Sequence, residues 1–343
     1  MILRDTHWNP EVVPWMTLTE TDLAVMAEEL VSFHGQFQGC YGRQEHHRLG
    51  LAYLSGLMSK LEAKSAEPIA LEFLGAAGVR PLQRFMKNDR WDQEAMKSQH
   101  QVLLSQLLAD PEGMTTVDSS EFAKKGQESV GVARQYCGAL GKVENCQSGV
   151  FVGYTSQHGY GLLTGRLYLP EVWFSKEYEQ RRKDNWVPKD LIFQTKIAIA
   201  QALIQEVTQT QLFPSRWIGF DSTFGSDLLF LESLPKEINY FASVRSNTQV
   251  FLKKPSVGVP EYSGRGPRPK KRRWLPNQPG PQTVADIARR PRLRWKKVVM
   301  AEGAKGPIVA EVARLRVYPA RDGLPTAYSL WLFLRRNLDG QIK

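Results

Sequence analysis

Two aspartates, Asp118 and Asp221, are the first candidates for chemistry in this chain, because each directly follows a short apolar run. The run 114–117 precedes Asp118, and the run 217–220 precedes Asp221. A carboxylate at the end of a buried strand costs free energy unless it binds a cation or a hydrogen-bond donor. If the two strands are neighbours in one sheet, both carboxylates project from the same edge and offer hard oxygen ligands to Mg²⁺ or Mn²⁺.

Such a pair of carboxylates suits phosphoryl transfer. Two divalent cations about 3.5–4 Å apart activate an attacking water or 3′-hydroxyl and stabilise the leaving oxygen at a phosphodiester. The alternative is that each aspartate caps the turn or helix that follows it. On spacing alone the capping interpretation is favoured, because short patterns of this kind also match by chance.

A basic segment is the second candidate. The formal net charge of the whole chain is +10, and twelve Lys and Arg with a single Asp lie between 265 and 297. This concentration predicts a polyanionic partner held largely by one segment, and two tryptophans, Trp274 and Trp295, are expected to stack on exposed bases. The alternative is a solvated, disordered charge run. The candidate DNA contacts here are Arg268, Lys270, Lys271, Arg272, Arg273, Arg294, Lys296 and Lys297.

Three further cations lie close to Asp118 in the sequence. Lys124 and Lys125 follow Asp118 closely, so they could contact the strand that is cut. The alternative, that both are solvated residues of a turn, is nearly as well supported. Arg134 falls in a predicted strand, where a buried cation needs a phosphate or a carboxylate as partner.

The chain has three cysteines, a sparse and odd number that indicates a reducing compartment without a disulfide framework. Cys40 lies close to His46 and His47, but a fourth ligand at a recognised spacing is lacking, so we do not predict zinc there. Cys137 and Cys146 flank a predicted turn and are expected to be small core residues.

These candidates need elements to position them, and the sequence divides into three stretches. Residues 1–110 have helical periodicity, with a capping box at Thr19–Asp22 and a second helix over 44–64, and are expected to form a DNA-binding domain. From 111 to 245 we expect an α/β core. Its predicted elements are strands near 114–117, 129–136, 146–154 and 161–168, a helix over 193–211, a strand over 217–220, a helix over 227–234 and a strand over 239–244.

Residues 246–343 are predicted to be a β-rich basic insertion, with strands over 308–318 and 328–335 and a mobile segment over 253–307. The 343 residues suffice for about two domains, and 42% hydrophobic with 23% charged residues is typical of a soluble protein. The chain has no apolar run of the roughly 20 residues needed to span a bilayer. Its first residues lack a signal-peptide pattern, so the cytoplasm is the expected location.

Five sequence runs, with GLMSKLEAK (56–64) and LQRF (82–85) followed by WD (91–92) upstream of them, carry a resemblance to a known family. They are VDSSEFAKKG (117–126), SVGVARQY (129–136), GKVENCQ (141–147), RLYLPEVW (166–173) and GFDSTFG (219–225). Together they resemble the bacterial insertion-sequence transposases of the DDE superfamily that share a KKG…SVGVARQYCG…NCQ core. The resemblance covers most of residues 50–245 and is highly specific.

The resemblance implies a ribonuclease H-like mixed sheet, with a helical N-terminal domain and a β-rich basic insertion, that cuts and rejoins DNA ends. Asp118 matches the first catalytic and metal-binding aspartate of the family, and Asp221 matches the second. The implied cofactor is Mg²⁺ or Mn²⁺. The implied partners are double-stranded DNA, as element ends and target, and a second copy on paired ends. Neither a membrane nor a small-molecule substrate is implied, and the location would be the bacterial cytoplasm at the nucleoid.

The family's third carboxylate is a Glu on a helix beyond a strand like 328–335, with a Lys seven positions later. Glu302, Glu311, Asp322 and Asp339 do not fit that helical context. We therefore expect a transposase that is truncated at its C-terminus and impaired in activity. One alternative is a non-catalytic DNA-binding protein derived from a transposase, and another is a related metal-dependent nuclease that never transposes.

Overall fold

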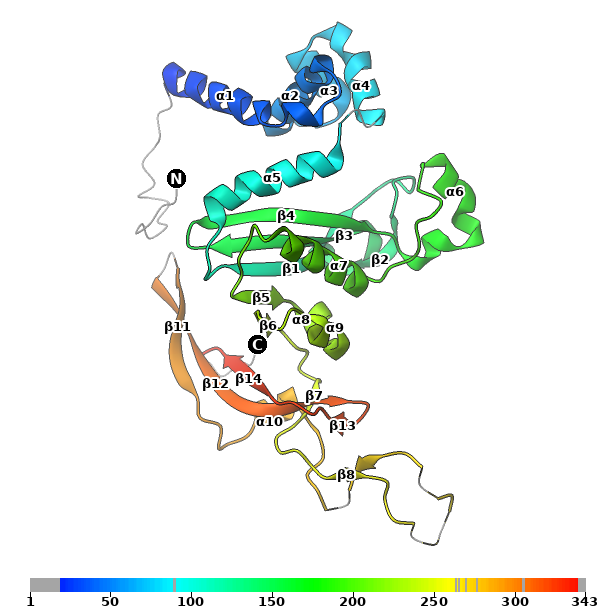
Figure 1. Ribbon diagram of the computed structural model, residues 1–343, viewed down its shortest axis with the longest axis vertical. Coiled ribbons are helices and arrows are strands. Elements are labelled where there is room, and N and C mark those ends of the chain that lie inside the picture. The colour runs from blue at the N-terminus through cyan, green and yellow to red at the C-terminus, as the bar shows by residue number, and fades with distance from the viewer. Residues whose placement is uncertain are drawn as a thin grey trace. The chain divides into compact units, whose positions relative to one another are not determined.

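The computed structural model describes residues 19–88, 91–262, 264, 266–268, 270–275, 277–303 and 306–338 (Figure 1). The chain divides into two compact units. We call residues 19–115 and 119–216 the N-terminal unit, and Thr116–Asp118 with 217–338 the C-terminal unit. Strand β1 (Met114–Ala123) contributes residues to both units.

Helices make up the first part of the N-terminal unit. They are α1 (Glu20–Gly35), α2 (Gln44–Met58), α3 (Ala66–Phe73), α4 (Val79–Lys87) and α5 (Gln93–Leu108). The capping box predicted at the start of α1 is confirmed, because Thr19 and Asp22 exchange side-chain and backbone hydrogen bonds. A small core of Leu49, Ile69, Ala70, Leu82 and Phe85 joins α2, α3 and α4.

Strands β2 (Ala133–Cys137), β3 (Lys142–Ser156) and β4 (Gly159–Tyr168) follow in antiparallel order, and β1 is the other neighbour of β3. The strand predicted over 129–136 begins later, at Ala133. A turn precedes it, in which the Val132 N–H donates to the Ser129 carbonyl and Gly131 has φ +81°. The strand predicted over 114–117 is longer and continues to Ala123.

Two helices complete the N-terminal unit, α6 (Glu179–Asp184) and α7 (Lys196–Thr210). The helix predicted over 193–211 is α7, which begins after the N-cap Thr195. Its buried stripe packs against β3 and β4 and consists of Ile199, Ala200, Leu203, Ile204 and Val207.

The C-terminal unit contains β5 (Trp217–Phe220), α8 (Ser222–Gly225), α9 (Leu228–Ser233) and β6 (Asn239–Ala242), and β5 and β6 pair in parallel. Within this unit β5 is the neighbour of Thr116–Asp118 of β1. The strand order is β2-β3-β1-β5-β6, and β4 is also paired with β3. Antiparallel and parallel pairs in one sheet, with helices between the parallel strands, confirm the predicted α/β class and its ribonuclease H-like mixed sheet.

A second sheet follows, in the order β10-β7-β12-β11, with β13 and β14 also paired to β12. Its strands are β7 (Gln249–Phe251), β10 (Gln282–Thr283), β11 (Lys296–Gly303), β12 (Gly306–Arg321), β13 (Leu324–Pro325) and β14 (Leu330–Arg336). Helix α10 (Val284–Ala288) covers the buried face of this sheet. Strands β8 (Val257–Gly258) and β9 (Arg273–Trp274) form a separate two-stranded antiparallel sheet.

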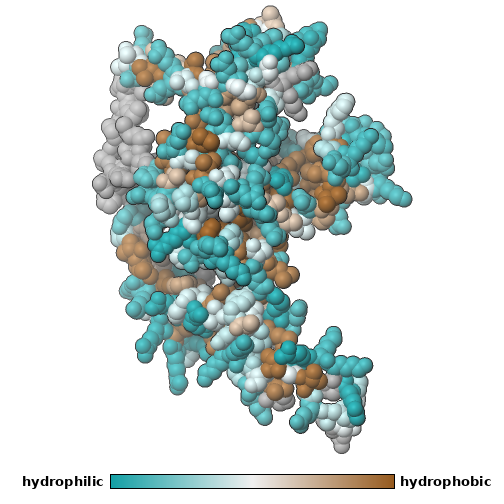
Figure 2. Space-filling view, viewed as in Figure 1, coloured by the Kyte–Doolittle hydropathy of each residue, from teal (hydrophilic) through white to brown (hydrophobic). Residues whose placement is uncertain are grey.

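The surface is mainly hydrophilic in the view of Figure 2, but hydrophobic side chains gather over β11. Val298, Val299 and Met300 of β11 and Ile308 of β12 are exposed. Within the described ranges, every helix is too short or too polar to cross a membrane.

Candidate functional site

The two strands that carry the aspartates, β1 and β5, begin side by side. The Arg216 N–H donates to the Gly113 carbonyl at 2.9 Å, and the Thr115 and Ser215 hydroxyls are hydrogen-bonded at 2.7 Å. The side chains of Glu112 and Arg216 form an ion pair at the same place. Because both strands lead away from this shared starting point and are hydrogen-bonded neighbours, they run in the same direction.

Asp118 and Asp221 therefore lie at similar distances along two neighbouring strands, within about one residue of each other in register. Each lies five residues beyond the hydrogen bond from Arg216 to Gly113, both side chains are exposed, and both belong to the C-terminal unit. Neighbouring strands are about 4.8 Å apart, so residues at similar distances along adjacent strands are near neighbours. Asp221 directly follows the end of β5, as predicted, whereas Asp118 lies within β1 rather than at its end.

The buried side chain of Tyr154, on β3, ties together the segments that lead into both strands. Its hydroxyl is 3.1 Å from the Asp110 amide, 2.8 Å from the Asp110 carbonyl and 2.6 Å from the Pro214 carbonyl. The hydroxyl has one proton, so it accepts from the amide and donates to one carbonyl at a time. Burial raises the pKa of Tyr154, which keeps that proton in place. No sequence pattern marks this residue.

Asp221 is also a helix cap. One carboxylate oxygen accepts from the Thr223 amide at 2.9 Å and the Phe224 amide at 3.4 Å, and the other accepts from the Thr223 hydroxyl at 2.8 Å. The capping alternative is thus correct for Asp221. Capping and metal binding are compatible, because each carboxylate oxygen has two acceptor lone pairs and the cap fixes the side chain.

Glu121 is a carboxylate that the sequence analysis overlooked. Side chains alternate along β1, so Glu121 projects from the face opposite to Asp118. It accepts from Lys196 Nζ at 2.8 Å, Ser148 Oγ at 3.1 Å and Ser119 Oγ at 3.2 Å. Burial alone would raise the pKa of Glu121, but these donors together lower it. This ionised carboxylate holds the first residue of α7 against the sheet.

Lys124 and Lys125 are exposed in the turn after β1. The Asn145 amide on β3 donates to the carbonyls of Lys124 at 2.7 Å and Gly126 at 2.9 Å, so the turn has a fixed anchor. Arg134 is exposed on the edge strand β2. Its side chain is therefore solvated and needs no buried partner, and the neighbouring Ala133 is buried, as alternation along a strand allows.

The cations proposed for the basic segment are all exposed: Arg268, Lys270, Lys271, Arg272, Arg273, Arg294, Lys296 and Lys297. The two tryptophans among them are half-buried. The Arg336 guanidinium lies 4.3 Å from the centroid of the Trp295 ring, which also packs on the core of the second sheet. Trp295 is thus covered and does not offer the free stacking surface that we expected. Arg265, at the start of the run, lies outside the described residues.

The other acids weighed as a third ligand lie in strands or turns. Glu302 is on β11, Glu311 on β12 pairs with Arg336 at 2.7 Å, and Asp322 is in the turn after β12 with φ +50°. Asp339 lies outside the described residues. In the part of the chain that the structure describes, no three His, Cys, Asp or Glu side chains come close enough to hold one metal ion.

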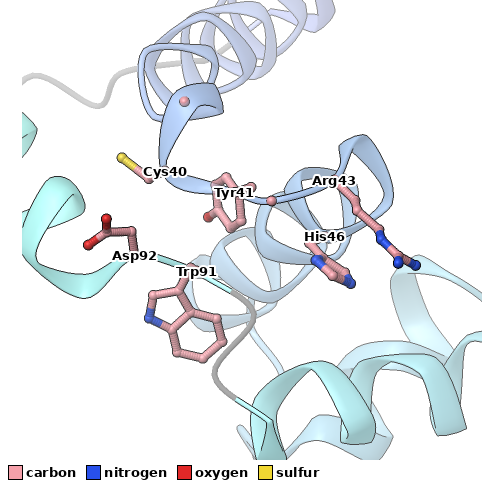
Figure 3. Close-up of a pocket in the computed structure, with 8 residues that line it drawn as sticks. Cys40, Tyr41, Arg43, His46, Trp91 and Asp92 are labelled. Atoms are coloured by element: carbon pink, nitrogen blue, oxygen red, sulfur yellow. The ribbon is translucent and has the colours of Figure 1, made fainter.

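A cavity of about 460 Å³ lies beside α2 and is lined by Gly39, Cys40, Tyr41, Gly42, Arg43, His46, Trp91 and Asp92 (Figure 3). The Cys40 sulfur points away from His46, and burial and nearby Asp92 raise the pKa of this thiol. Cys137 and Cys146 are fully buried and free, which confirms their prediction as core residues.

Known proteins similar to this chain agree with its fold. A family model described as DDE superfamily endonuclease matches residues 36–307. The probable transposase for insertion sequence element IS701 of Microchaete diplosiphon is 29% identical over 201 residues, 57% of this chain and 48% of that protein. This chain thus spans about half the length of that curated relative. The predicted resemblance to insertion-sequence transposases is confirmed, and because the family model covers most of its length, the chain belongs to the DDE superfamily endonucleases.

Proposed function

We propose that this chain acts in DNA transposition, cutting the ends of an insertion sequence and transferring the freed strand, with Asp118 and Asp221 as catalytic metal ligands. The observation that carries the proposal is the placement of the two exposed aspartates on neighbouring strands, each five residues past the hydrogen bond that joins the starts of those strands. DDE superfamily endonucleases generally depend on a divalent metal. We propose Mg²⁺ or Mn²⁺, because both prefer carboxylate oxygen.

The residues present fit such an ion. Mg²⁺ is usually held by one or two carboxylates together with water and substrate phosphates. Asp118 and Asp221, both exposed, would provide these carboxylate ligands. When bound, the metal activates a water or 3′-hydroxyl for in-line attack and stabilises the leaving oxygen. The chain contributes the alignment of Asp118 with Asp221 and, through Thr223 and Phe224, a fixed orientation of the Asp221 carboxylate.

The proposed partner is double-stranded DNA, both as element ends and as target, with two copies of the chain acting on paired ends at the nucleoid. Lys124 and Lys125 are six and seven residues from Asp118 and are exposed, which suits contacts to the scissile strand. The exposed cations of the basic segment would neutralise phosphates, so binding should weaken steeply with salt.

A second candidate is a non-catalytic DNA-binding protein, or a transposase of impaired activity. It is favoured by the number of carboxylates at the site, since the described residues bring two to this edge and the family uses three. Both candidates predict the same salt-sensitive binding to DNA and differ only in cleavage.

The deciding experiment incubates the chain with Mg²⁺ or Mn²⁺ and supercoiled DNA that carries the ends of its own element. We expect metal-dependent nicking that Asp118→Asn and Asp221→Asn abolish. Asp227→Asn is the matched control, because Asp227 caps α9 as Asp221 caps α8. Salt-sensitive binding without cleavage would support the second candidate, and absence of binding would overturn both.

A further inference from the structure

One face of the strand pair formed by β12 and β14 is buried. Ala313 and Val317 of β12 and Leu332 and Leu334 of β14 belong to the core of this sheet. Side chains alternate between the two faces of a strand, so the residues between these project from the opposite face. That opposite face carries cations and aromatic rings instead of the polar neutral residues of an ordinary solvated face.

The pairing of β12 with β14 places arginines beside aromatic rings. Arg314 is paired with Phe333, and Arg316 with Trp331. The Arg314 and Arg316 guanidinium carbons lie 5.4 Å and 5.1 Å from the centroid of the Trp331 ring. Trp331 and Phe333 are nevertheless 51% and 50% exposed, so both rings keep surface available to a ligand.

The same face continues across all three strands. Val312 of β12 is paired with Lys296 of β11 on one side and with Arg335 of β14 on the other. Both cations are exposed. We name this surface the Arg–Trp face, which consists of Lys296, Arg314, Arg316, Trp331, Phe333 and Arg335.

The positive charge of the Arg–Trp face is not balanced by acids. Among the residues that the structure describes, no carboxylate forms an ion pair with Arg314, Arg316 or Arg335, and Arg316 donates instead to the Ser329 hydroxyl at 2.8 Å. Arg336, on the other face, shows the contrast, since its guanidinium binds Glu311 at 2.7 Å. Four unbalanced cations around two exposed rings favour a polyanion that also presents flat aromatic groups.

We propose that the Arg–Trp face binds an unpaired DNA strand, with bases stacked on Trp331 and Phe333 and phosphates held by the surrounding cations. Exposed aromatic side chains stack on bases whose faces are free, and a duplex hides those faces. The two rings are two residues apart on one strand, roughly 7 Å, so each can take its own base. The inference deepens the proposed function, because cleavage at an element end is what would supply unpaired nucleotides.

A second copy of this chain is the competing occupant. A symmetric pairing of two Arg–Trp faces would place eight cations against one another, and like charges across an interface are unfavourable. The exposed apolar residues Val298, Val299 and Met300 of β11 adjoin one end of the face, beyond Lys296, and are not among its six residues. Charge therefore favours DNA over self-association at this surface.

The test is fluorescence anisotropy of the full chain with labelled single-stranded and double-stranded oligonucleotides of one sequence. EDTA is present, so the result does not depend on cleavage. We expect Trp331→Ala to weaken single-strand binding about tenfold and to leave duplex binding unchanged. Trp331→Phe should keep most of the affinity, because a ring is retained. Tyr160→Ala removes an aromatic side chain that is 86% exposed elsewhere and serves as the matched control.

Two further measurements keep the proposal open to refutation. A single strand containing 5-iododeoxyuridine, crosslinked by light and mapped by mass spectrometry, should attach at Trp331 or Phe333. Arg314→Gln with Arg316→Gln should lower the slope of log affinity against log salt by about 0.7 for each phosphate that is no longer neutralised. Equal weakening of single-strand and duplex binding, or a dimer that Trp331→Ala dissociates while single-strand binding is unchanged, would overturn it.

Discussion

Asp118 and Asp221 lie on two neighbouring strands that run in the same direction, each five residues past the hydrogen bond from the Arg216 amide to the Gly113 carbonyl. If both carboxylates hold one cation, either single substitution removes most of the site. Asp118→Asn and Asp221→Asn should each weaken Mn²⁺ binding by about tenfold or more. The double variant should be little weaker than either one, since ligands of one ion are coupled. Electron paramagnetic resonance of free Mn²⁺ measures this, and additive losses would show two independent sites.

Different substitutions of Asp221 distinguish its role as a helix cap from its proposed role as a metal ligand. Asp221→Ala removes both the acceptor for Thr223 and the metal ligand, so it should cost about 1 kcal/mol of stability as well as metal binding. Asp221→Asn keeps an acceptor oxygen and should lose metal binding at nearly normal stability. Asp227→Ala, the equivalent cap of α9, should lose stability alone. Urea unfolding followed by circular dichroism, together with Mn²⁺ titration, distinguishes the three.

Tyr154 is expected to act on the aspartates from a distance. Tyr154→Phe leaves the Asp110 amide and the Asp110 and Pro214 carbonyls without their shared partner, which should cost about 1–3 kcal/mol. It should also weaken Mn²⁺ binding, because those segments lead into β1 and β5. Tyr160→Phe, on an exposed ring, is the control and should change neither property. Normal metal binding in a destabilised Tyr154→Phe would show that the tie serves folding alone.

The sequence was informative where a local pattern determines the structure. Apolar runs that end in Asp118 and Asp221 predict two strands with carboxylates, and both strands exist. The continuation of β1 to Ala123 was missed because Ser119 and Glu121 look like loop residues. They are part of a strand because Lys196, 75 residues later, supplies a partner for Glu121.

Exposure was harder to predict than secondary structure, because it depends on which strands become neighbours. Arg134 is exposed on β2 although Ala133 and Cys137 of the same strand are buried. Trp295 lies in the basic run but is half-buried against the core and Arg336, whereas Trp331, outside that run, is 51% exposed even with Arg314 and Arg316 beside its ring. The exposure of Trp331 could have been predicted from the alternation in LWLFLRR (330–336), which places leucines on one face of the strand and aromatic and basic residues on the other.

The pair Glu121–Lys196 should make folding sensitive to acid. Its donors lower the pKa of Glu121 below the ordinary 4.5, so the pair stabilises the fold above that value and the contribution is lost as pH falls further. Lys196→Met leaves a mostly buried carboxylate without its cation and should cost about 2 kcal/mol at pH 7. Glu121→Gln with Lys196→Met should recover part of that loss. A urea series at pH 7 and pH 4 tests this, and equal stability of the single and double variants at pH 7 would contradict it.

His34 should give the helical region a separate pH dependence. Burial, with a smaller effect of His47, lowers the pKa of His34 to about 4, so the folded chain keeps this ring neutral. The unfolded chain takes up the proton near its ordinary 6.5, and it therefore binds more protons than the folded chain between pH 6.5 and 4. As pH is lowered from 6.5 to 4, the free energy of unfolding should therefore decrease by up to about 3 kcal/mol, and below pH 4 it should level off. His34→Asn should flatten this part of the curve, as measured by urea unfolding at half-unit steps of pH. The variant lacks the imidazole ring and its hydrogen bond to the Tyr41 hydroxyl at 3.0 Å. If the free energy of unfolding has the same slope against pH in wild type and variant, other groups cause the pH dependence.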